Sequence, residues 1–455
     1  MSKQVDVLNL EWSSSPSRDR ESSTLVCNYL RYQGLNVVEG SVFIGFSLIN
    51  QLKPKLLFIS NAIGATINID LVKYAKSLGI YCVTGTSEGN FREEQISQFI
   101  WGHNTEQILF EDFWAVWTKQ AKEMVVKKHP EISNRVVICG GQGFDRYVIS
   151  SHDDQWFKPT QEQTSKLTIG IGCWDFGLFY EQDSRYRKIS KHLDKNQIDF
   201  FKADCLKFNK ELKTLIENHP HITFIIKLHP GNQLGDASSG VEGLRNLPNV
   251  YIYKNDASVL QCICASDIWL SYESTTAMEA WLMNKPTALL NPSGIDFPLR
   301  HNMHLAQPNF PDAKAWSSAI NEFIKTGILP EFSKYLDRQK DIIRSTIQWD
   351  DGLNHVRIGN VILNLLESAP PPAPFPPHAG KQSFNILNRI KHLAYWKLSS
   401  SLRILPRFGK FYKQHKSIWS EPQLNAFSAN RQTDQITFYQ EYNLSKALLR
   451  SISGD

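Results

Sequence analysis

Hydrophobic and polar positions in the first 150 residues alternate between two patterns. Short runs of aliphatic and β-branched residues, such as VDVLNL at 5–10 and KLLFIS at 55–60, predict buried strands. Between them lie segments with apolar residues at helical spacing, of which 65–78 is the clearest. Strand–helix alternation of this kind builds a parallel, doubly wound sheet. The predicted strands cover residues 5–10, 35–40, 55–60, 80–85 and 136–140, and the predicted helices residues 20–33, 65–78 and 118–128.

A second domain with the same alternation follows a polar, aperiodic stretch at 148–166, which predicts a linker. Its strongest strand, ITFIIKLHP at 222–230, ends in His-Pro. The predicted strands are 167–172, 222–230, 249–253, 267–271 and 286–291, and the predicted helices 201–218, 257–264, 274–284, 312–326 and 354–367. The predicted domains are residues 1–150, a linker at 151–166, and residues 167–367.

The end of the chain has a different composition. A proline-rich spacer at 368–380 is stiff and extended, and it separates the body from a basic tail at 381–455. Residues 381–416 hold nine Lys and Arg and no acidic residue, with apolar residues on one helical face. This pattern predicts an amphipathic helix on an anionic membrane surface. The alternative is a helix that packs on the slightly acidic body, and no nucleic-acid-binding module is recognisable.

The composition is that of a globular protein. The chain has 455 residues, 42% of them hydrophobic, which suits two domains and an appendage. Residues 1–20 lack the apolar core of a signal peptide, and no run of about 18 apolar residues spans a membrane. Seven irregularly spaced cysteines argue against a disulfide framework or a metal site. We therefore expect a cytoplasmic protein that is peripheral on a membrane.

The first chemically distinctive cluster is Lys227, His229 and Pro230, at the carboxyl end of a predicted strand. In open α/β sheets, ligands bind in the crevice beyond such ends. Proline stops the strand and directs the His backbone into that crevice. His can donate to a phosphate or ribose oxygen, and Lys adds a positive charge. The alternative is a surface turn that happens to contain a histidine.

A second cluster, LSYESTTAMEAWLMNKP at 270–286, passes from a strand into a helix. Hydroxyls of Ser274, Thr275 and Thr276 and the free N–H groups of a helix start suit an anion. Glu279, one turn further on, is expected on an accessible face, where it could accept hydrogen bonds from ribose hydroxyls. The alternative is helix capping, with Glu279 as the partner in a capping box.

The two clusters together resemble GT-B glycosyltransferases of bacterial capsule and lipopolysaccharide biosynthesis. The family includes HP-motif sialyl-, polysialyl- and Kdo-transferases, and CDP-glycerol glycerophosphotransferases are related to it. The resemblance covers roughly residues 30–366. It implies two Rossmann-like doubly wound domains facing a cleft, with His229 and the hydroxyls at 274–276 on the nucleotide and its phosphate. GGQGFDRY at 140–147 is similar to the segment that ends the family's first domain.

The resemblance also places the catalytic base. Ser87-Glu88-Gly89 stands where the family has an acidic–acidic–Gly motif, so Glu88 is the remaining candidate for the carboxylate that takes the acceptor's proton. The alternative for Glu88 is a solvated loop residue. No Asp-x-Asp motif is present, and no metal or cofactor is expected.

The sequence thus predicts a metal-independent glycosyltransferase that uses a CMP- or UDP-sugar donor and a surface-polysaccharide or lipid-linked acceptor. Three alternatives stay open: a polyol-phosphate transferase, a sugar-nucleotide epimerase, and a non-catalytic membrane-tethered scaffold.

Overall fold

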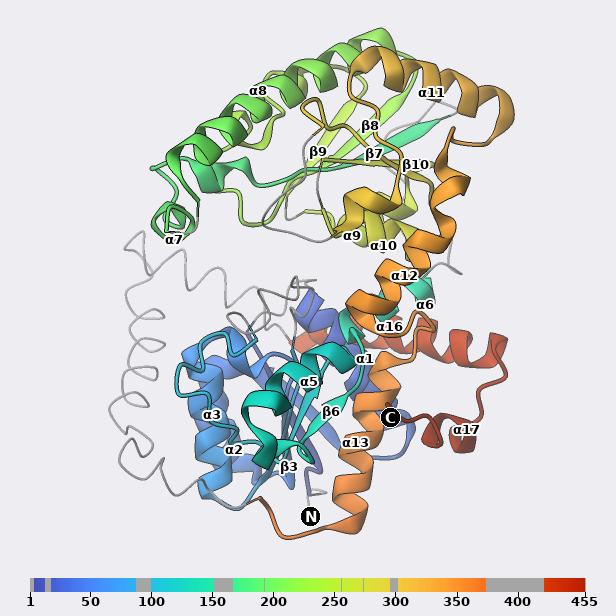
Figure 1. Ribbon diagram of the computed structural model, residues 1–455. Helices are drawn as coiled ribbons and strands as arrows, with labels where there is room; N and C mark the ends of the chain where they lie inside the picture. The colour runs from blue at the N-terminus through green and yellow to red at the C-terminus, as the bar shows by residue number, and fades with distance from the viewer. Residues whose placement is uncertain are drawn as a thin grey trace. The chain divides into compact units, whose positions relative to one another are not determined.

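The computed structural model describes residues 4–12, 18–86, 100–150, 167–191, 193–254, 256–272, 274–294, 302–373 and 421–454. The chain forms two compact units, residues 1–149 with 344–455 (unit 1) and residues 150–343 (unit 2). Each unit is built around its own parallel sheet with helices on both faces (Figure 1). The predicted α/β class with two Rossmann-like domains is confirmed.

Unit 1 holds a six-stranded sheet in the order β2-β1-β3-β4-β5-β6. Every predicted strand of this domain is present, within a few residues of its expected ends. The strands are β1 (Val7–Glu11), β2 (Val37–Ser41), β3 (Leu56–Ile59), β4 (Tyr81–Thr84), β5 (Phe113–Val116) and β6 (Val136–Ile138). The helices between them are α1 (Arg18–Tyr32), α2 (Gly45–Leu52), α3 (Thr66–Ser77), α5 (Lys119–Lys128) and α6 (Asp145–Ser150).

Strand β5 and helix α2 are among the elements of unit 1 that escaped prediction. Strand β5 has only four residues, FWAV, too short for a recognisable period. Helix α2 begins at Gly45, a residue that disfavours helices. Both are held by tertiary contacts: β5 lies between β4 and β6, and α2 buries Phe46 and Ile49. Local propensity is a weak guide where packing decides the element.

Unit 1 is completed by the end of the chain. We expected 354–367 to finish the second domain and 381–455 to form a tail. Instead α13 (Asn354–Ser368) packs on α1, as does α16 (Glu421–Glu441), which is followed by α17 (Lys446–Arg450). Phe438 and Leu449 are 2% and 0% exposed in the core they share with α1. Spacing identified the apolar face of α13 but not the domain that it covers. The amphipathic segment 381–416, the linker 151–166 and most of the spacer lie outside the described residues.

Unit 2 holds a five-stranded parallel sheet in the order β11-β10-β7-β8-β9. Its strands are β7 (Thr168–Gly172), β8 (Thr223–Lys227), β9 (Val250–Tyr253), β10 (Ile268–Ser271) and β11 (Thr287–Leu289). Helices α8 (Lys195–Asn218) and α11 (Ala313–Thr326) cover one face, and α9 (Val259–Cys264) and α10 (Thr276–Leu282) the other (Figure 1). The short α7 (Tyr186–Ile189) and α12 (Leu336–Ile347) were not predicted.

Helix α8 shows how a local signal sets an element's start. It begins at Lys195, six residues before the predicted start, because Asp194 and Gln197 form a reciprocal capping box. Its apolar face buries Phe201, Phe208 and Leu212 in the core of unit 2. The capping box therefore sets the start of the helix, and the apolar face attaches it to the core of unit 2.

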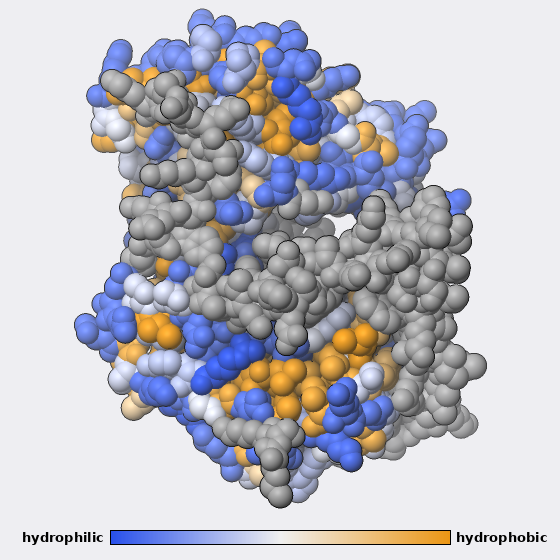
Figure 2. Space-filling model, turned by 180° about the vertical axis from the view of Figure 1, so that it is seen from behind, coloured by the Kyte–Doolittle hydropathy of each residue, from blue (hydrophilic) through white to orange (hydrophobic). Residues whose placement is uncertain are grey.

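The surface mixes polar and apolar groups. Hydrophilic residues cover much of the face drawn in Figure 2, with hydrophobic residues gathered in patches between them. No helix within the described ranges is long and apolar enough to cross a membrane. All seven cysteines are free thiols, and six of them are buried.

Candidate functional site

The order of strands in unit 2 creates a topological switch point beside β7. The chain winds from β7 through β8 to β9, then returns across the sheet to place β10 on the other side of β7. Because the strands are parallel, the carboxyl ends of β8, β7 and β10 share one edge, and β8 and β10 are separated there by about 10 Å. Ligands of open α/β sheets bind at such points. The two predicted clusters follow β8 and β10, so both lie at this edge.

Glycine brings the start of α10 against the end of β7. A Cβ on Gly172, the last residue of β7, would lie 2.4 Å from Thr276 Oγ1 and 3.1 Å from Trp269 Nε1. Only a residue without a side chain permits this approach. The start of α10 therefore lies directly against the end of β7.

His229 lies two residues beyond β8, and its side chain is 33% exposed. Its Nδ1 accepts the Gly231 N–H at 3.1 Å and lies 3.4 Å from Asp175 Oδ2. A neutral ring that accepts at Nδ1 carries its hydrogen on Nε2, and a protonated ring carries hydrogens on both nitrogens. In both states Nε2 is a donor. Nε2 has no hydrogen-bond partner within the described part of the chain.

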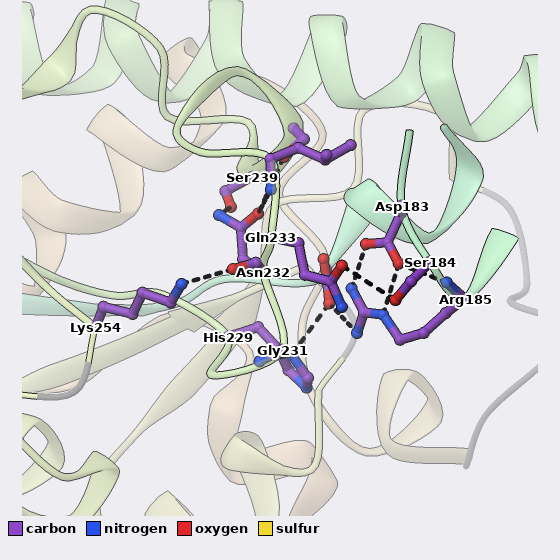
Figure 3. Close-up of polar contacts among 12 residues, drawn as sticks. Asp183, Ser184, Arg185, His229, Gly231, Asn232, Gln233, Ser239 and Lys254 are labelled. Atoms are coloured by element: carbon purple, nitrogen blue, oxygen red, sulfur yellow. Dashed lines mark hydrogen bonds and ion pairs between the residues drawn. The ribbon is translucent and has the colours of Figure 1, made fainter. Parts of the chain in front are cut away.

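Asp175 and Arg185 are site residues that the sequence did not reveal. Both come from the segment after β7. Arg185 Nη1 lies 2.7 Å from Asp175 Oδ2, the same oxygen that faces His229. Its Nε donates to Asp183 Oδ1 at 2.8 Å, and Nη2 pairs with Asp183 Oδ2. Figure 3 shows Arg185 between Asp183 and the His229–Gly231 turn.

The electrostatics of this cluster favour charged groups. The Asp175 and Asp183 side chains are 2% and 0% exposed. Burial would raise the pKa of Asp175, but its contacts with His229 and Arg185 outweigh burial and hold that pKa below its usual value. Hydrogen bonds from Arg185 lower the pKa of Asp183. Both carboxylates are therefore ionised at neutral pH.

The turn after β8 has no room for another side chain. A Cβ on Gly231 would lie 2.5 Å from Arg185 Nη1 and 3.0 Å from His229 Nδ1. Pro230, the predicted strand stop, lies just past the end of β8 at Lys227. The Pro-Gly pair thus lets the β8 turn close onto the loop after β7.

Lys227 is directed to the backbone. Its Nζ donates to the carbonyl oxygens of Leu228 at 3.0 Å and Lys254 at 2.5 Å. Burial lowers the pKa of its ammonium group. Two of the three ammonium hydrogens therefore bond to backbone just beyond β8 and β9 and so link these two strand ends. A contact between the third hydrogen and a phosphate stays a prediction.

The hydroxyl cluster at α10 is bonded within itself. Ser274 Oγ accepts the Thr276 N–H at 3.2 Å and the Thr276 hydroxyl at 3.0 Å. Thr276 Oγ1 also accepts from Trp269 Nε1 at 3.0 Å. Thr275 is 8% exposed. Thr275, at the N-cap position of α10, makes no side-chain capping bond, so the helix-capping alternative is not confirmed. A ligand would meet the hydroxyls of Ser274 and Thr276 already held in place.

Two other predicted residues need separate comment. The expectation that Glu279 lies on an accessible face is wrong: it is 2% exposed in α10, whose seven residues are nearly all buried. Its ribose contact stays a prediction. Glu88 lies outside the described residues. No group of three His, Cys, Asp or Glu in the described ranges is arranged to hold a metal.

No protein-family model and no curated protein sequence matches the chain. Solved structures do. A Listeria monocytogenes protein described as a UDP-N-acetylglucosamine 2-epimerase matches with a TM-score of 0.52 and 12% identity, over 82% of this chain and 100% of that one. A second UDP-N-acetylglucosamine 2-epimerase matches with a TM-score of 0.50 and 13% identity, over 82% and 98%. The wall teichoic acid polymerase TagF matches with a TM-score of 0.52 and 12% identity, over 80% and 90%. These likenesses confirm the GT-B type of fold.

Proposed function

We propose that this chain is a nucleotide-sugar enzyme whose unit 2 binds the donor at the carboxyl ends of β8, β7 and β10. The observation that carries the proposal is the position of His229 and of Ser274–Thr276 on either side of β7 at the switch point. The fold likeness to two sugar-nucleotide epimerases and a teichoic acid polymerase supports it. CMP- and UDP-sugars are the candidate donors.

His229 is suited to the leaving phosphate. In a transfer, an acceptor hydroxyl oxygen forms a bond to the anomeric carbon while the bond from that carbon to the phosphate oxygen breaks. The electron pair of the broken bond goes to the phosphate, and the acceptor proton goes to a base, for which Glu88 is our candidate. A donor N–H at Nε2 stabilises the negative charge that grows on the phosphate.

We further propose sugar transfer to a surface-polysaccharide or lipid-linked acceptor, at the cytoplasmic face of a bacterial inner membrane. This rests on the resemblance of the KLHP and SYESTTAMEAW segments and on the basic segment 381–416. Sugar-nucleotide epimerisation is an equally supported second candidate, since two of the similar structures are epimerases. Polyol-phosphate transfer and a non-catalytic scaffold remain alternatives, because fold does not determine chemistry.

A donor panel separates these functions. Thermal-shift assays with CMP, CDP, UDP and GDP identify the nucleobase of the donor. A nucleotide that binds only the folded chain raises the stability of that chain. Mass analysis of products from the matching sugar nucleotide then decides the reaction. Transfer adds a sugar to the acceptor and frees the nucleotide, whereas epimerisation leaves the donor mass unchanged. Absence of binding by every nucleotide would contradict the proposal.

Replacement of His229 by alanine tests the site itself. His229→Ala removes a charge-assisted hydrogen bond of about 1.5–3 kcal/mol, so kcat/KM should fall about 10- to 100-fold. The matched control is His221→Ala, an exposed histidine that precedes the same strand, β8. Steady-state kinetics on both variants gives the comparison. Equal activity of the two variants would remove His229 from the site.

A further inference from the structure

We propose that Asp175 is a positioning residue that acts through His229: its buried carboxylate holds the protonated imidazole so that Nε2–H points to the phosphate of the bound donor. The inference rests on the proposed function and deepens it, because it names the group that makes His229 a cationic donor. The residue was not apparent from the sequence, although it follows the end of β7 by three positions, much as His229 follows β8.

The geometry places Asp175 behind the ring. Oδ2 lies 3.4 Å from Nδ1, and the 33% exposed ring leaves Nε2 on its other side for a ligand. When the ring is neutral, Nδ1 accepts from Gly231 N–H. When it is protonated, Nδ1 carries a hydrogen that can face only an acceptor, and Asp175 Oδ2 is the charged acceptor beside it. A carboxylate at this distance in a buried setting stabilises the cation.

The charges around the ring leave Asp175 as its counter-ion. The segment after β7 supplies Asp175, Asp183 and Arg185. Asp183 binds the Nε side of the guanidinium and so offsets its charge. At the carboxyl ends of β8 and β9, Lys227 and Lys254 direct their ammonium groups to backbone carbonyls, that of Lys254 to Asn232 at 2.6 Å. The cluster of two carboxylates and one guanidinium thus carries one excess negative charge, which a protonated His229 balances.

Arg185 competes for the same oxygen. Its Nη1 is 2.7 Å from Asp175 Oδ2, closer than His229 Nδ1 at 3.4 Å. The guanidinium therefore weakens the hold of Asp175 on His229. Removal of the carboxylate and removal of the guanidinium must then change the basicity of His229 in opposite directions. A merely structural role for either residue would not produce opposite changes.

The experiment is a histidine titration of the full-length chain by NMR. Histidine labelled with 13C at Cε1 is followed against pH, and the His229 signal is assigned by its absence in His229→Gln. The midpoint of the His229 titration should move to lower pH in Asp175→Asn, which loses the carboxylate, and to higher pH in Arg185→Gln, which loses the competing cation. The control Asp236→Asn removes a carboxylate of the same unit that pairs with Arg245 at 2.6 Å and has no contact with His229. It should leave the His229 titration unchanged.

Two results would overturn the proposal: an unchanged His229 titration in Asp175→Asn, or a shift of the same sign in Asp175→Asn and Arg185→Gln. If Asp175→Asn fails to fold, Arg185→Gln, whose side chain is 30% exposed, still gives the decisive sign. Turnover is a separate readout. In a plot of kcat/KM against pH, the part of the curve that depends on His229 should shift in the same direction as the His229 titration in each variant. The titration needs no substrate, so failure of the donor panel and failure of this inference are distinguishable.

Discussion

At the scale of single residues, the site depends on close approaches as much as on charged groups. Gly172 lets Thr276 lie against the end of β7, and Gly231 lets Arg185 and Asp175 reach the β8 turn. Neither glycine has a positive φ, so both are needed for space rather than for backbone conformation. The absence of a side chain at each position lets two segments approach this closely.

Gly172→Ala should weaken the site by steric conflict. The added Cβ would be 2.4 Å from Thr276 Oγ1, so Thr276 or Trp269 must move, at a cost of about 1–3 kcal/mol. We expect a lower midpoint of thermal unfolding and weaker nucleotide binding by calorimetry. Adding Thr276→Ala removes the oxygen that clashes and should restore part of the stability; strictly additive losses would show that the contact is not the cause.

At the scale of elements, the last helices of the chain are structural parts of unit 1. The ring of His355 links three elements, since its Nδ1 lies 2.8 Å from Asp145 Oδ2 and its Nε2 lies 2.6 Å from the Tyr439 hydroxyl. Gln435 donates to that hydroxyl at 2.7 Å. The chain of bonds runs from α16 through α13 to α6, and all its members are buried. A buried network of this kind specifies which helices pack together.

Tyr439→Phe tests this network. The change removes one oxygen and leaves His355 Nε2 and Gln435 without their buried partner, which costs about 1–3 kcal/mol. Scanning calorimetry of the full chain should show a lower midpoint of unfolding. Tyr442→Phe, at a 53% exposed position just past the same helix, serves as the control and should unfold like the parent. Similar midpoints for the two variants would mean that the network contributes nothing to stability.

At the scale of the whole molecule, ion pairs in both units tie stability to pH. Asp183 in unit 2 is paired with Arg185, and Asp351 in unit 1 with Arg357 at 2.6 Å. Hydrogen bonds from Arg185 lower the pKa of Asp183, and those from Arg357 outweigh burial to lower the pKa of Asp351. Carboxyls with a lowered folded pKa bind fewer protons when folded than when unfolded. Their stabilisation is present above the unfolded pKa, about 3.9, and is lost as pH falls through the folded pKa.

Asp183→Asn should therefore destabilise the chain at neutral pH and much less in acid. The midpoint of thermal unfolding, measured from pH 7 down to about pH 3, should differ most between parent and variant at pH 7. Glu181→Gln, an exposed carboxylate two residues away, is the control. A difference that stays constant over the whole range would contradict the role of the Asp183–Arg185 pair.

The alternation of strand and helix periods in the sequence predicted much of this structure. Among the described residues it predicted all but one of the eleven strands within a few residues, because a buried parallel strand is a short continuous apolar run that local sequence records. The same logic put His229 and Ser274 at strand ends, where chain direction alone brings them to one edge of a sheet. The orientations of Lys227 and Glu279 did not follow, since a side chain's direction depends on which carbonyls and neighbours surround it.

Only the tertiary structure decided which segments are neighbours. The order β11-β10-β7-β8-β9 sets β7 between the two predicted clusters, and thereby brings Asp175 and Arg185 to His229, 54 and 44 positions away along the chain. The tertiary structure also assigns α13 and α16 to unit 1. An apolar period indicates that one face of a helix or strand is buried, but many other elements of the chain could cover that face. The choice among them is made by packing and buried polar pairing over the whole unit, which no local pattern contains.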